Sequence, residues 1–199
     1  FGGRPVWFAA GVQAEELPVV LQAHRQALRH SHRMLLILSP AHPDQAEAAA
    51  IEVADAGLDT LLWGDGPDPD ETTQVMIADD MAARGLFFRL APVSFLGSSL
   101  VAEGDSCDPF EAAALGSAVL YGPRIGRFLH SYSRLAAAGA ARIVNDAEAL
   151  GTAVSRLIAP DQAATMAHAG WDVISQGAEQ TDRITELVQD TLDAKARRP

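Results

Sequence analysis

Short apolar segments alternate with helical segments along the chain, and this alternation limits the possible folds more than any other feature. Each apolar segment is four or five residues long, and most are followed by an amphipathic or Ala-rich stretch of helical length. The predicted strands are Val6–Ala10, Met34–Leu38, Thr60–Trp63, Gln74–Ile77, Val93–Leu96, Ala118–Tyr121 and Ala141–Val144. Apolar strands separated by helices are typical of a parallel sheet covered on both faces. We therefore predict a single Rossmann-like α/β domain over residues 1–199, with a helical C-terminal extension.

The segments between these strands give the remaining elements. The predicted helices are Ala14–His30, Pro43–Ala56, Met81–Leu90, one that begins at Pro109, Phe128–Ala138, one that ends at Leu157, Asp161–Ser175 and Glu179–Ala194. The acidic segment Gly64–Glu71 is rich in Gly, Pro and Asp, which indicates an exposed, mobile loop. His24, His30 and His32 fall near the end of the first helix, and we expect them at the surface.

The charge of the chain excludes several classes of function. The net charge is −11, which argues against nucleic acid as a partner because phosphate binding needs a basic stripe. The same charge gives no long-range attraction for an anionic ligand, so any anion site must be local. Fourteen of the fifteen basic residues are arginines, and the single lysine, Lys195, lies in the tail. This argues against a Schiff-base mechanism, for which Lys195 is the only candidate.

Cysteine content and hydropathy set further limits. The single Cys107 excludes an internal disulfide and fits a reducing compartment. No Cys/His cluster has the spacing of metal ligands, so we expect no metal site. No apolar run is long enough to span a bilayer, and we expect a soluble protein. Because the chain begins at Phe1, without an initiator Met or a signal-peptide pattern, we expect it to be a piece of a longer protein.

The segment from residue 93 to residue 122 has the pattern of a strand–loop–helix–strand unit with a ligand site. Asp108 is a natural N-cap, Pro109 suits the first helical position, and Glu111 follows within the first turn. The N–H groups of such a helix can bind an anion, and the carboxylate can accept hydrogen bonds from a ribose diol. The alternative is an ordinary βαβ unit, in which Glu111 reaches back to the N–H of the cap residue. Cys107, just before this helix, is placed where a thiol can have a lowered pKa.

In sheets of this kind, ligands bind beyond the carboxyl ends of the strands. The loops expected there are Gly11–Glu16, Pro40–Pro43, Ala78–Met81, Gly97–Asp108 and Gly122–Arg127, and four of the five carry polar or charged groups. The chain has neither a GxGxxG motif after the first strand nor a P-loop, so NAD and ATP lack their usual fingerprints.

Six sequence motifs together resemble a known enzyme family. They are PVWFAA, LLILSPAHP, ADDM, GLFFRLAPVSFLGSSLV, DPFEAAALGSAVLYGP and AGAARIVNDAEAL. In order and spacing they are similar to the C-terminal half of 3-deoxy-D-manno-octulosonic acid (Kdo) transferases, which are inverting GT-B glycosyltransferases of lipopolysaccharide biosynthesis. These enzymes transfer Kdo from CMP-Kdo to a lipid A precursor. The resemblance covers nearly the whole chain.

The resemblance implies that the two halves of the full-length protein bind different substrates. In the family, the C-terminal half binds the donor, whereas the N-terminal half holds the acceptor site and the carboxylate base. The chain is therefore expected to bind CMP-Kdo or a similar nucleotide sugar without a further cofactor. Its expected partners are its own N-terminal acceptor domain and, through that domain, the lipid A precursor. The full-length protein is expected at the cytoplasmic face of the inner membrane, as a peripheral or anchored protein.

The resemblance also implies individual site residues. Glu111 matches the family glutamate that holds the CMP ribose, and Asp108 with Pro109 begins the helix of the donor loop. The other implied donor contacts are Gly97, Ser98 and Ser99 in the family's Gly-Gly-Ser turn, Asp79 and Met81 in its Gly-Asp-Thr-Met-Gly-Glu loop, and Pro40, His42 and Pro43 around its Arg-His-Pro. No catalytic residue is implied in this half.

The chain departs from the family at several of these motifs. The family arginine before His-Pro is Ala41 here, so a positive charge near the donor is missing. The Gly-Gly-His-Asn-Pro loop is replaced by EGDSCDP, which places the carboxylate of Asp108 where it would repel the carboxylate of the sugar. The segment GPRIGRF introduces Arg124 and Arg127, which either bind the anionic donor or face solvent. After the first strand, the family's Ser-Thr-His-Glu-Gly-Glu-Glu is replaced by GVQAEEL, which retains Glu16. The family's Gly-Glu after the methionine is Ala82-Ala83 here.

Three hypotheses about function follow. The chain is the donor domain of a diverged Kdo transferase, the donor domain of a related glycosyltransferase with another nucleotide sugar, or a non-catalytic protein that uses the transferase fold for binding. A compact single-domain enzyme, with Asp79, Asp80 or Asp105 as its base, is the alternative to a half-enzyme.

Overall fold

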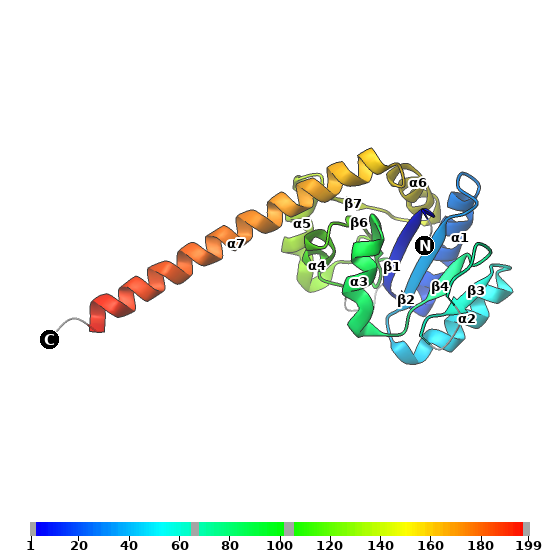
Figure 1. The fold of residues 1–199 in the computed structure, drawn as a ribbon, viewed down its shortest axis with the longest axis horizontal. Helices are drawn as coiled ribbons and strands as arrows, with labels where there is room; N and C mark the ends of the chain where they lie inside the picture. The colour runs from blue at the N-terminus through cyan, green and yellow to red at the C-terminus, as the bar shows by residue number, and fades with distance from the viewer. Residues whose placement is uncertain (1–2, 65–67, 102–105, 197–199) are drawn as a thin grey trace.

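The described strands form one parallel sheet. The structure, a computed structural model, describes residues 3–64, 68–101 and 106–196, except for the side chains of residues 178–180, 182 and 193–196. The strand order is β3-β4-β2-β1-β5-β6-β7, and every pair of neighbours is parallel (Figure 1). The strands are β1 (Val6–Val12), β2 (Leu35–Pro40), β3 (Thr60–Leu62), β4 (Val75–Ile77), β5 (Val93–Leu96), β6 (Ala118–Tyr121) and β7 (Ala141–Ile143). The predicted parallel sheet is confirmed.

Helices cover both faces of this sheet. The α-helices are α1 (Leu17–Leu28), α2 (Ala46–Asp55), α3 (Arg84–Leu90), α4 (Pro109–Ala114), α5 (Leu129–Ala137), α6 (Ala147–Leu157) and α7 (Pro160–Ala196). Single 3₁₀ turns precede four of them: η1 (Ala14–Glu16), η2 (Pro43–Gln45), η3 (Met81–Ala83) and η4 (Gly126–Phe128). The alternation of side chains along β1 shows the two layers, because Trp7 packs with α1, α2 and α6, whereas Phe8 packs with α3, α4 and α5.

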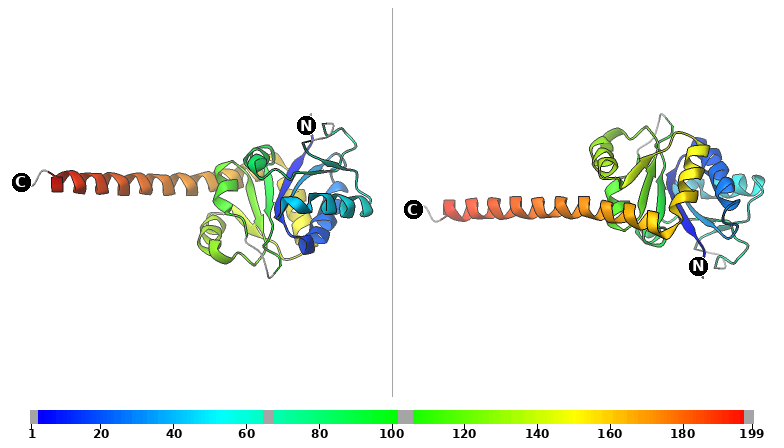
Figure 2. Two further views of the ribbon diagram at one scale, coloured as in Figure 1. Left: turned by 90° about the horizontal axis from the view of Figure 1, so that it is seen from below. Right: turned by 90° about the horizontal axis from the view of Figure 1, so that it is seen from above.

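The C-terminal extension is one continuous helix and not the two that the sequence predicts. α7 runs from Pro160 to Ala196 through Gly177, where a break was expected. A single glycine lowers helix propensity, but it does not remove a backbone N–H as proline would, so the helix continues. The first part of α7 packs on the domain, with Gly170 close to the methyl groups of Ala113 and Ala140. Its second part projects from the domain as a rod (Figures 1 and 2).

His24 is in the core, and the prediction that it lies at the surface is wrong. Its side chain is 0% exposed, whereas His30 and His32 are exposed as predicted. The Trp7 indole N–H donates to Nδ1 of His24 at 3.1 Å, and Nε2 lies 3.0 Å from the backbone oxygen of Gln74. Both ring nitrogens are therefore used to join α1, β1 and the start of β4, a role that helical periodicity alone does not reveal.

The acidic loop before β4 is partly outside the described residues, at positions 65–67. Its described end is fixed by hydrogen bonds, because the carboxylate of Asp70 accepts from both Thr72 and Thr73. These bonds, from the Thr72 hydroxyl first, lower the pKa of Asp70 to about 2. Among the described residues, none of the helices has the length and apolarity needed to cross a bilayer.

Candidate functional site

The site is expected where the direction of winding reverses. From β1 the chain winds outward through β2 to β3 and β4, and then returns to place β5 on the other side of β1. The carboxyl ends of β1 and β5 are therefore adjacent, and the loops that follow them meet at this edge of the sheet. Ligands of open α/β sheets bind at such a point. The loops after β1, β4 and β5 bring most of the predicted site residues to this edge.

A buried carboxylate joins the two central loops. Glu16, in the turn after β1, has a side chain that is 0% exposed. Its oxygens accept hydrogen bonds from the backbone N–H groups of Ser98 (2.6 Å), Ser99 (2.8 Å) and Leu100 (2.8 Å) in the loop after β5, and from Gln13 (3.0 Å). Four N–H donors replace the water that burial removes, as a buried carboxylate requires. Glu16 thus fixes the shape of the loop after β5.

The Gly97–Ser99 turn is built around this carboxylate. Ser98 has a φ of 53°, a left-handed conformation that side chains rarely adopt. Its hydroxyl donates to the Gly11 oxygen, and that of Ser99 donates to the Leu96 oxygen. A Cβ on Gly97 would lie 2.6 Å from the Gly11 oxygen, so only glycine allows the loops to approach so closely. These groups hold the turn together, and donor contact through it stays a prediction.

Glu111 forms an ion pair that the sequence analysis does not predict. One of its oxygens, Oε2, lies 2.7 Å from Nη2 of Arg84 at the start of α3. The side chains are 28% (Arg84) and 35% (Glu111) exposed, so a ligand can reach the pair. Asp108 caps α4 as predicted, but through the N–H of Phe110. The structure gives Glu111 a partner on another helix in place of the capping box. Arg84 lies three residues after Met81, the last residue of the ADDM motif, and its position in the first turn of the predicted helix at this edge was the available signal.

Cys107 does not have the environment of an activated thiol. Burial raises its pKa, and the carboxylates of Glu111, Glu16 and Asp108 add to this effect against the opposing charge of Arg84. The lowered pKa that a position before a helix N-terminus allows is therefore not found for this thiol. The backbone oxygen of Cys107 accepts a hydrogen bond from the Tyr132 hydroxyl at 2.9 Å, and its Sγ is close to Gly11. This residue packs the loop before α4 onto the domain.

The remaining predicted residues lie in the other loops at the same edge of the sheet. Asp79 and Met81 are exposed after β4, beside Asp80, whose carboxylate caps η3. His42 is exposed, and Pro40 lines a small apolar cavity of about 150 Å³ with Gln13 and Gln45 between the ends of β1 and β2 and helix α2. The predicted site residues that these loops and the start of α4 carry are Pro40, His42, Asp79, Met81, Gly97, Ser98, Ser99, Asp108, Pro109 and Glu111, and their contact with a donor stays a prediction. Asp105, an alternative base, lies outside the described residues.

Arg124 and Arg127 are exposed on the loop after β6. The backbone N–H of Arg124 donates to the Ser99 oxygen at 2.8 Å, which ties this loop to the central turn. The guanidinium of Arg127 lies over the ring of Phe128, 4.9 Å from its centroid. The contacts described for Arg124 and Arg127 do not test whether either residue binds an anionic donor, and this role stays a prediction. Within the described ranges no group of three potential metal ligands occurs.

Comparison with known proteins gives a consistent result. No family model matches the sequence. The chain is 27% identical over 192 residues to a 3-deoxy-D-manno-octulosonic acid transferase of Haemophilus influenzae, and 30% identical over 200 residues to that of Bordetella pertussis. Each alignment covers 96% of this chain and 45% of the relative. The chain thus spans less than half the length of these proteins.

Solved structures show the same fold. The C-terminal CMP-Kdo binding domain of WaaA from Acinetobacter baumannii superposes with a TM-score of 0.78 at 24% identity, covering 86% of this chain and 89% of that one. The C-terminal domain of the group 1 glycosyltransferase LpcC from Francisella tularensis gives a TM-score of 0.62 at 14% identity, covering 88% of both chains. The domain is therefore one half of a GT-B fold. Sequence and fold together identify the chain as a homologue of the C-terminal domain of Kdo transferases.

Proposed function

We propose that the chain is the donor-binding domain of an inverting glycosyltransferase of lipid A and lipopolysaccharide biosynthesis, and that its donor is CMP-Kdo or a closely related nucleotide sugar. The observation that carries this proposal is the match of nearly the whole chain to Kdo transferases, joined to the fold of a CMP-Kdo-binding domain. In this proposal the acceptor, a lipid A precursor, is bound by an N-terminal domain at the cytoplasmic face of the inner membrane.

The described geometry supports a ribose site at Glu111. Its carboxylate lies in the first turn of α4, the helix that follows β5 and its loop, and is partly exposed. Arg84 occupies Oε2 of Glu111, and among the described residues no hydrogen bond to Oε1 is found. An ionised carboxylate with one oxygen available is a suitable acceptor for a ribose hydroxyl.

Titration with nucleotides tests the proposal. Isothermal titration with CMP, UDP and GDP is expected to show binding of CMP only, with an affinity reduced about tenfold by Glu111→Gln, as for loss of one charge-assisted hydrogen bond. Glu148→Gln, an exposed glutamate in the first turn of α6, is the matched control and should bind CMP like the wild type. Absence of CMP binding in the unchanged chain would contradict the proposal.

A second candidate is a glycosyltransferase domain with another nucleotide sugar. The observation that favours it is the exposed carboxylate of Asp108 in the donor loop, together with Ala41 where the family has arginine. Both features suit a donor sugar that has no carboxylate of its own. Preference for UDP or GDP in the same titration would select this candidate. Failure to bind any of the three nucleotides would favour a non-catalytic binding protein.

A further inference from the structure

The charges that act on the loop before α4 are mostly negative. Besides burial, the carboxylates of Glu111, Glu16 and Asp108 all raise the pKa of the Cys107 thiol in this loop, and Arg84 is the described cation that lowers it. The chain as a whole has a net charge of −11 and therefore does not attract an anion over long distances. A nucleotide phosphate can approach Glu111 only if this local excess of negative charge is balanced.

Arg84 is held where it can provide this balance. Its Nη2 contacts Oε2 of Glu111 at 2.7 Å, and 28% of its side chain is exposed. Its Nε is buried and finds no hydrogen-bond partner among the described residues, so the guanidinium is placed by the pair with Glu111 and not by a complete set of bonds in the core. The pair joins the first turn of α3, which follows the loop after β4, to the first turn of α4, which follows the loop after β5.

We infer that Arg84 is a positioning and charge-balancing residue for an anionic nucleotide: it orients the Glu111 carboxylate toward the ribose and neutralises it toward the phosphate. The 5′-phosphate is attached to the same ribose that Glu111 is proposed to bind, so a cation paired with Glu111 acts on the phosphate at short range. Arg84 thereby replaces, from α3, the positive charge that is missing at Ala41 after β2. This inference rests on the proposed function.

The test compares CMP with cytidine, which has the same base and ribose but no phosphate. Arg84→Met is expected to weaken CMP binding at least tenfold and cytidine binding less than about threefold, so the preference for CMP falls. The loss of CMP affinity should be smaller at high ionic strength, because salt screens the charge that remains on Glu111. Arg84→Lys, which keeps the charge, should restore most of the CMP affinity. Because the pair is partly exposed, its removal should leave the domain folded.

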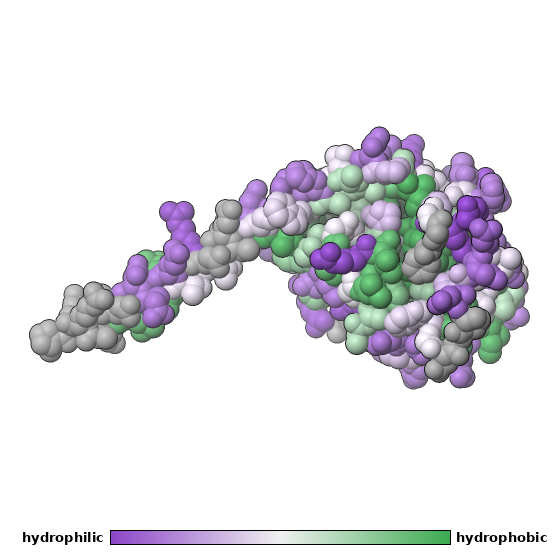
Figure 3. Space-filling view, viewed as in Figure 1, coloured by the Kyte–Doolittle hydropathy of each residue, from purple (hydrophilic) through white to green (hydrophobic). Residues whose placement is uncertain are grey.

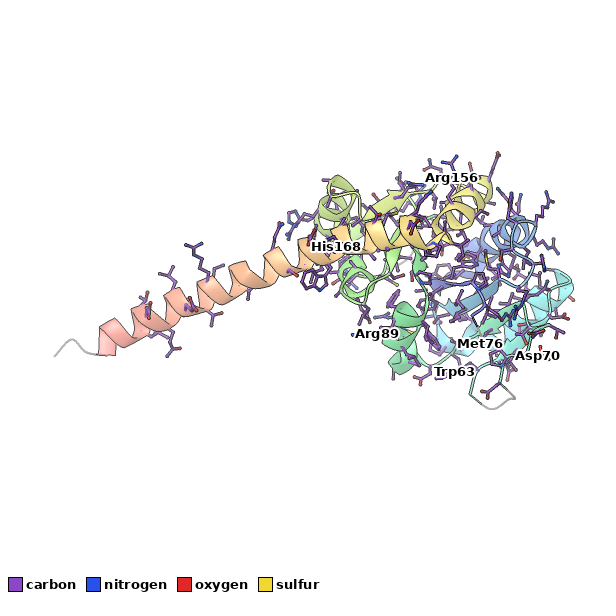
Figure 4. All side chains as sticks on the ribbon, turned by 45° about the horizontal axis from the view of Figure 1, so that its top comes forward. Trp63, Asp70, Met76, Arg89, Arg156 and His168 are labelled. Carbon is purple, nitrogen blue, oxygen red and sulfur yellow. The ribbon has the colours of Figure 1, made fainter. Side chains whose placement is uncertain are left out.

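Arg89→Met is the matched control, since Arg89 is an exposed arginine of the same helix, labelled in Figure 4. It should bind both ligands like the wild type. Equal losses of CMP and cytidine affinity in Arg84→Met, or no loss of either, would overturn the inference while leaving the proposed function intact. If the unchanged chain binds neither ligand, the proposed function itself fails, and the inference fails with it.

Discussion

At the scale of single residues, the side chain of Glu16 holds together two loops of the site through four hydrogen bonds. The sequence analysis identified it only as a retained position in a divergent motif, because nothing in the sequence pairs it with a loop more than 80 positions away. Its four N–H partners lie in two loops that meet only when β1 and β5 are neighbours in the sheet. The turn at Gly97–Ser99 could be predicted as part of the site, whereas the group that shapes it could not.

We expect Glu16→Gln to destabilise the domain by about 2–3 kcal/mol, because the amide has one acceptor oxygen and would place an NH₂ group against backbone N–H donors. The measurement is urea unfolding at pH 7. Glu15→Gln is the matched control, since the neighbouring glutamate is exposed and its replacement should change the free energy of unfolding by less than about 0.5 kcal/mol. Equal stability of the two variants would show that the four hydrogen bonds to Glu16 contribute little.

His24 makes the stability of the domain dependent on pH. Burial lowers its pKa from 6.5 to about 4 in the folded state, despite its hydrogen bond to Gln74. Above pH 6.5 the imidazole is neutral in both the folded and the unfolded state, so its titration does not lower the free energy of unfolding. As the pH falls from 6.5 toward 4, only the unfolded chain takes up the proton, and about 3 kcal/mol of stability is lost.

The measurement is urea unfolding of the wild type and of His24→Gln at pH 7 and pH 5. The variant should be less stable than the wild type at pH 7, but it should lose less stability between the two pH values. His30→Gln, at an exposed position of the same segment, should keep the wild-type dependence on pH. A pH dependence of His24→Gln as steep as that of the wild type would contradict this assignment.

At the scale of helices and strands, the elements that depend on local sequence pattern could be predicted. The contacts that depend on packing between elements could not. All seven strands could be predicted because they are short apolar runs between turns. The helices could be predicted to within a few residues, although their first turns are 3₁₀ and not α in four cases. The predicted break between Ser175 and Glu179 is wrong, because Gly177 keeps its backbone N–H and the helix continues through it. The pair between α3 and α4 at Arg84 and Glu111 escaped prediction because side-chain pairs between helices depend on their relative placement.

The projecting part of α7 has no packing within the described structure to support it. Its apolar side chains are exposed, from 52% to 67%, and they are Ile184, Leu187, Val188 and Leu192. Figure 3 shows apolar patches on this rod away from the body of the domain. Helices in proteins depend on tertiary packing of their apolar face for most of their stability.

We therefore expect amide hydrogen exchange in α7 to be slow up to about Val173, which is buried, and fast beyond Gly177. A chain ended after Gln176 should unfold within about 2 °C of the full chain, because the removed segment contributes little buried surface. Strong protection throughout α7 in the isolated chain would show that the apolar stripe is covered in solution.

At the scale of the whole molecule, a donor-binding domain of the proposed kind is expected to hold only part of an active site. Transfer requires the acceptor hydroxyl, its general base and the anomeric carbon of the donor to be held together. Three of the carboxylates described at this edge have structural partners: Glu16 is buried under four N–H groups, Glu111 pairs with Arg84, and Asp108 caps α4. Asp79 and Asp80 are exposed beside them. The chain also spans only 45% of the length of the transferases to which it is similar.

We therefore expect the 199-residue chain alone to bind its nucleotide but to transfer no sugar. The measurement is incubation of the purified chain with CMP-Kdo and lipid A precursor, followed by mass spectrometry of the lipid. Hydrolysis of the donor is followed in parallel, since it requires only water and does not count as transfer. If glycosylated lipid appears, Asp79→Asn and Asp80→Asn become the decisive variants, because these exposed carboxylates beside the site are the described candidates for a base within the chain. Loss of transfer in either variant would establish a single-domain enzyme, and the half-enzyme interpretation would have to be abandoned.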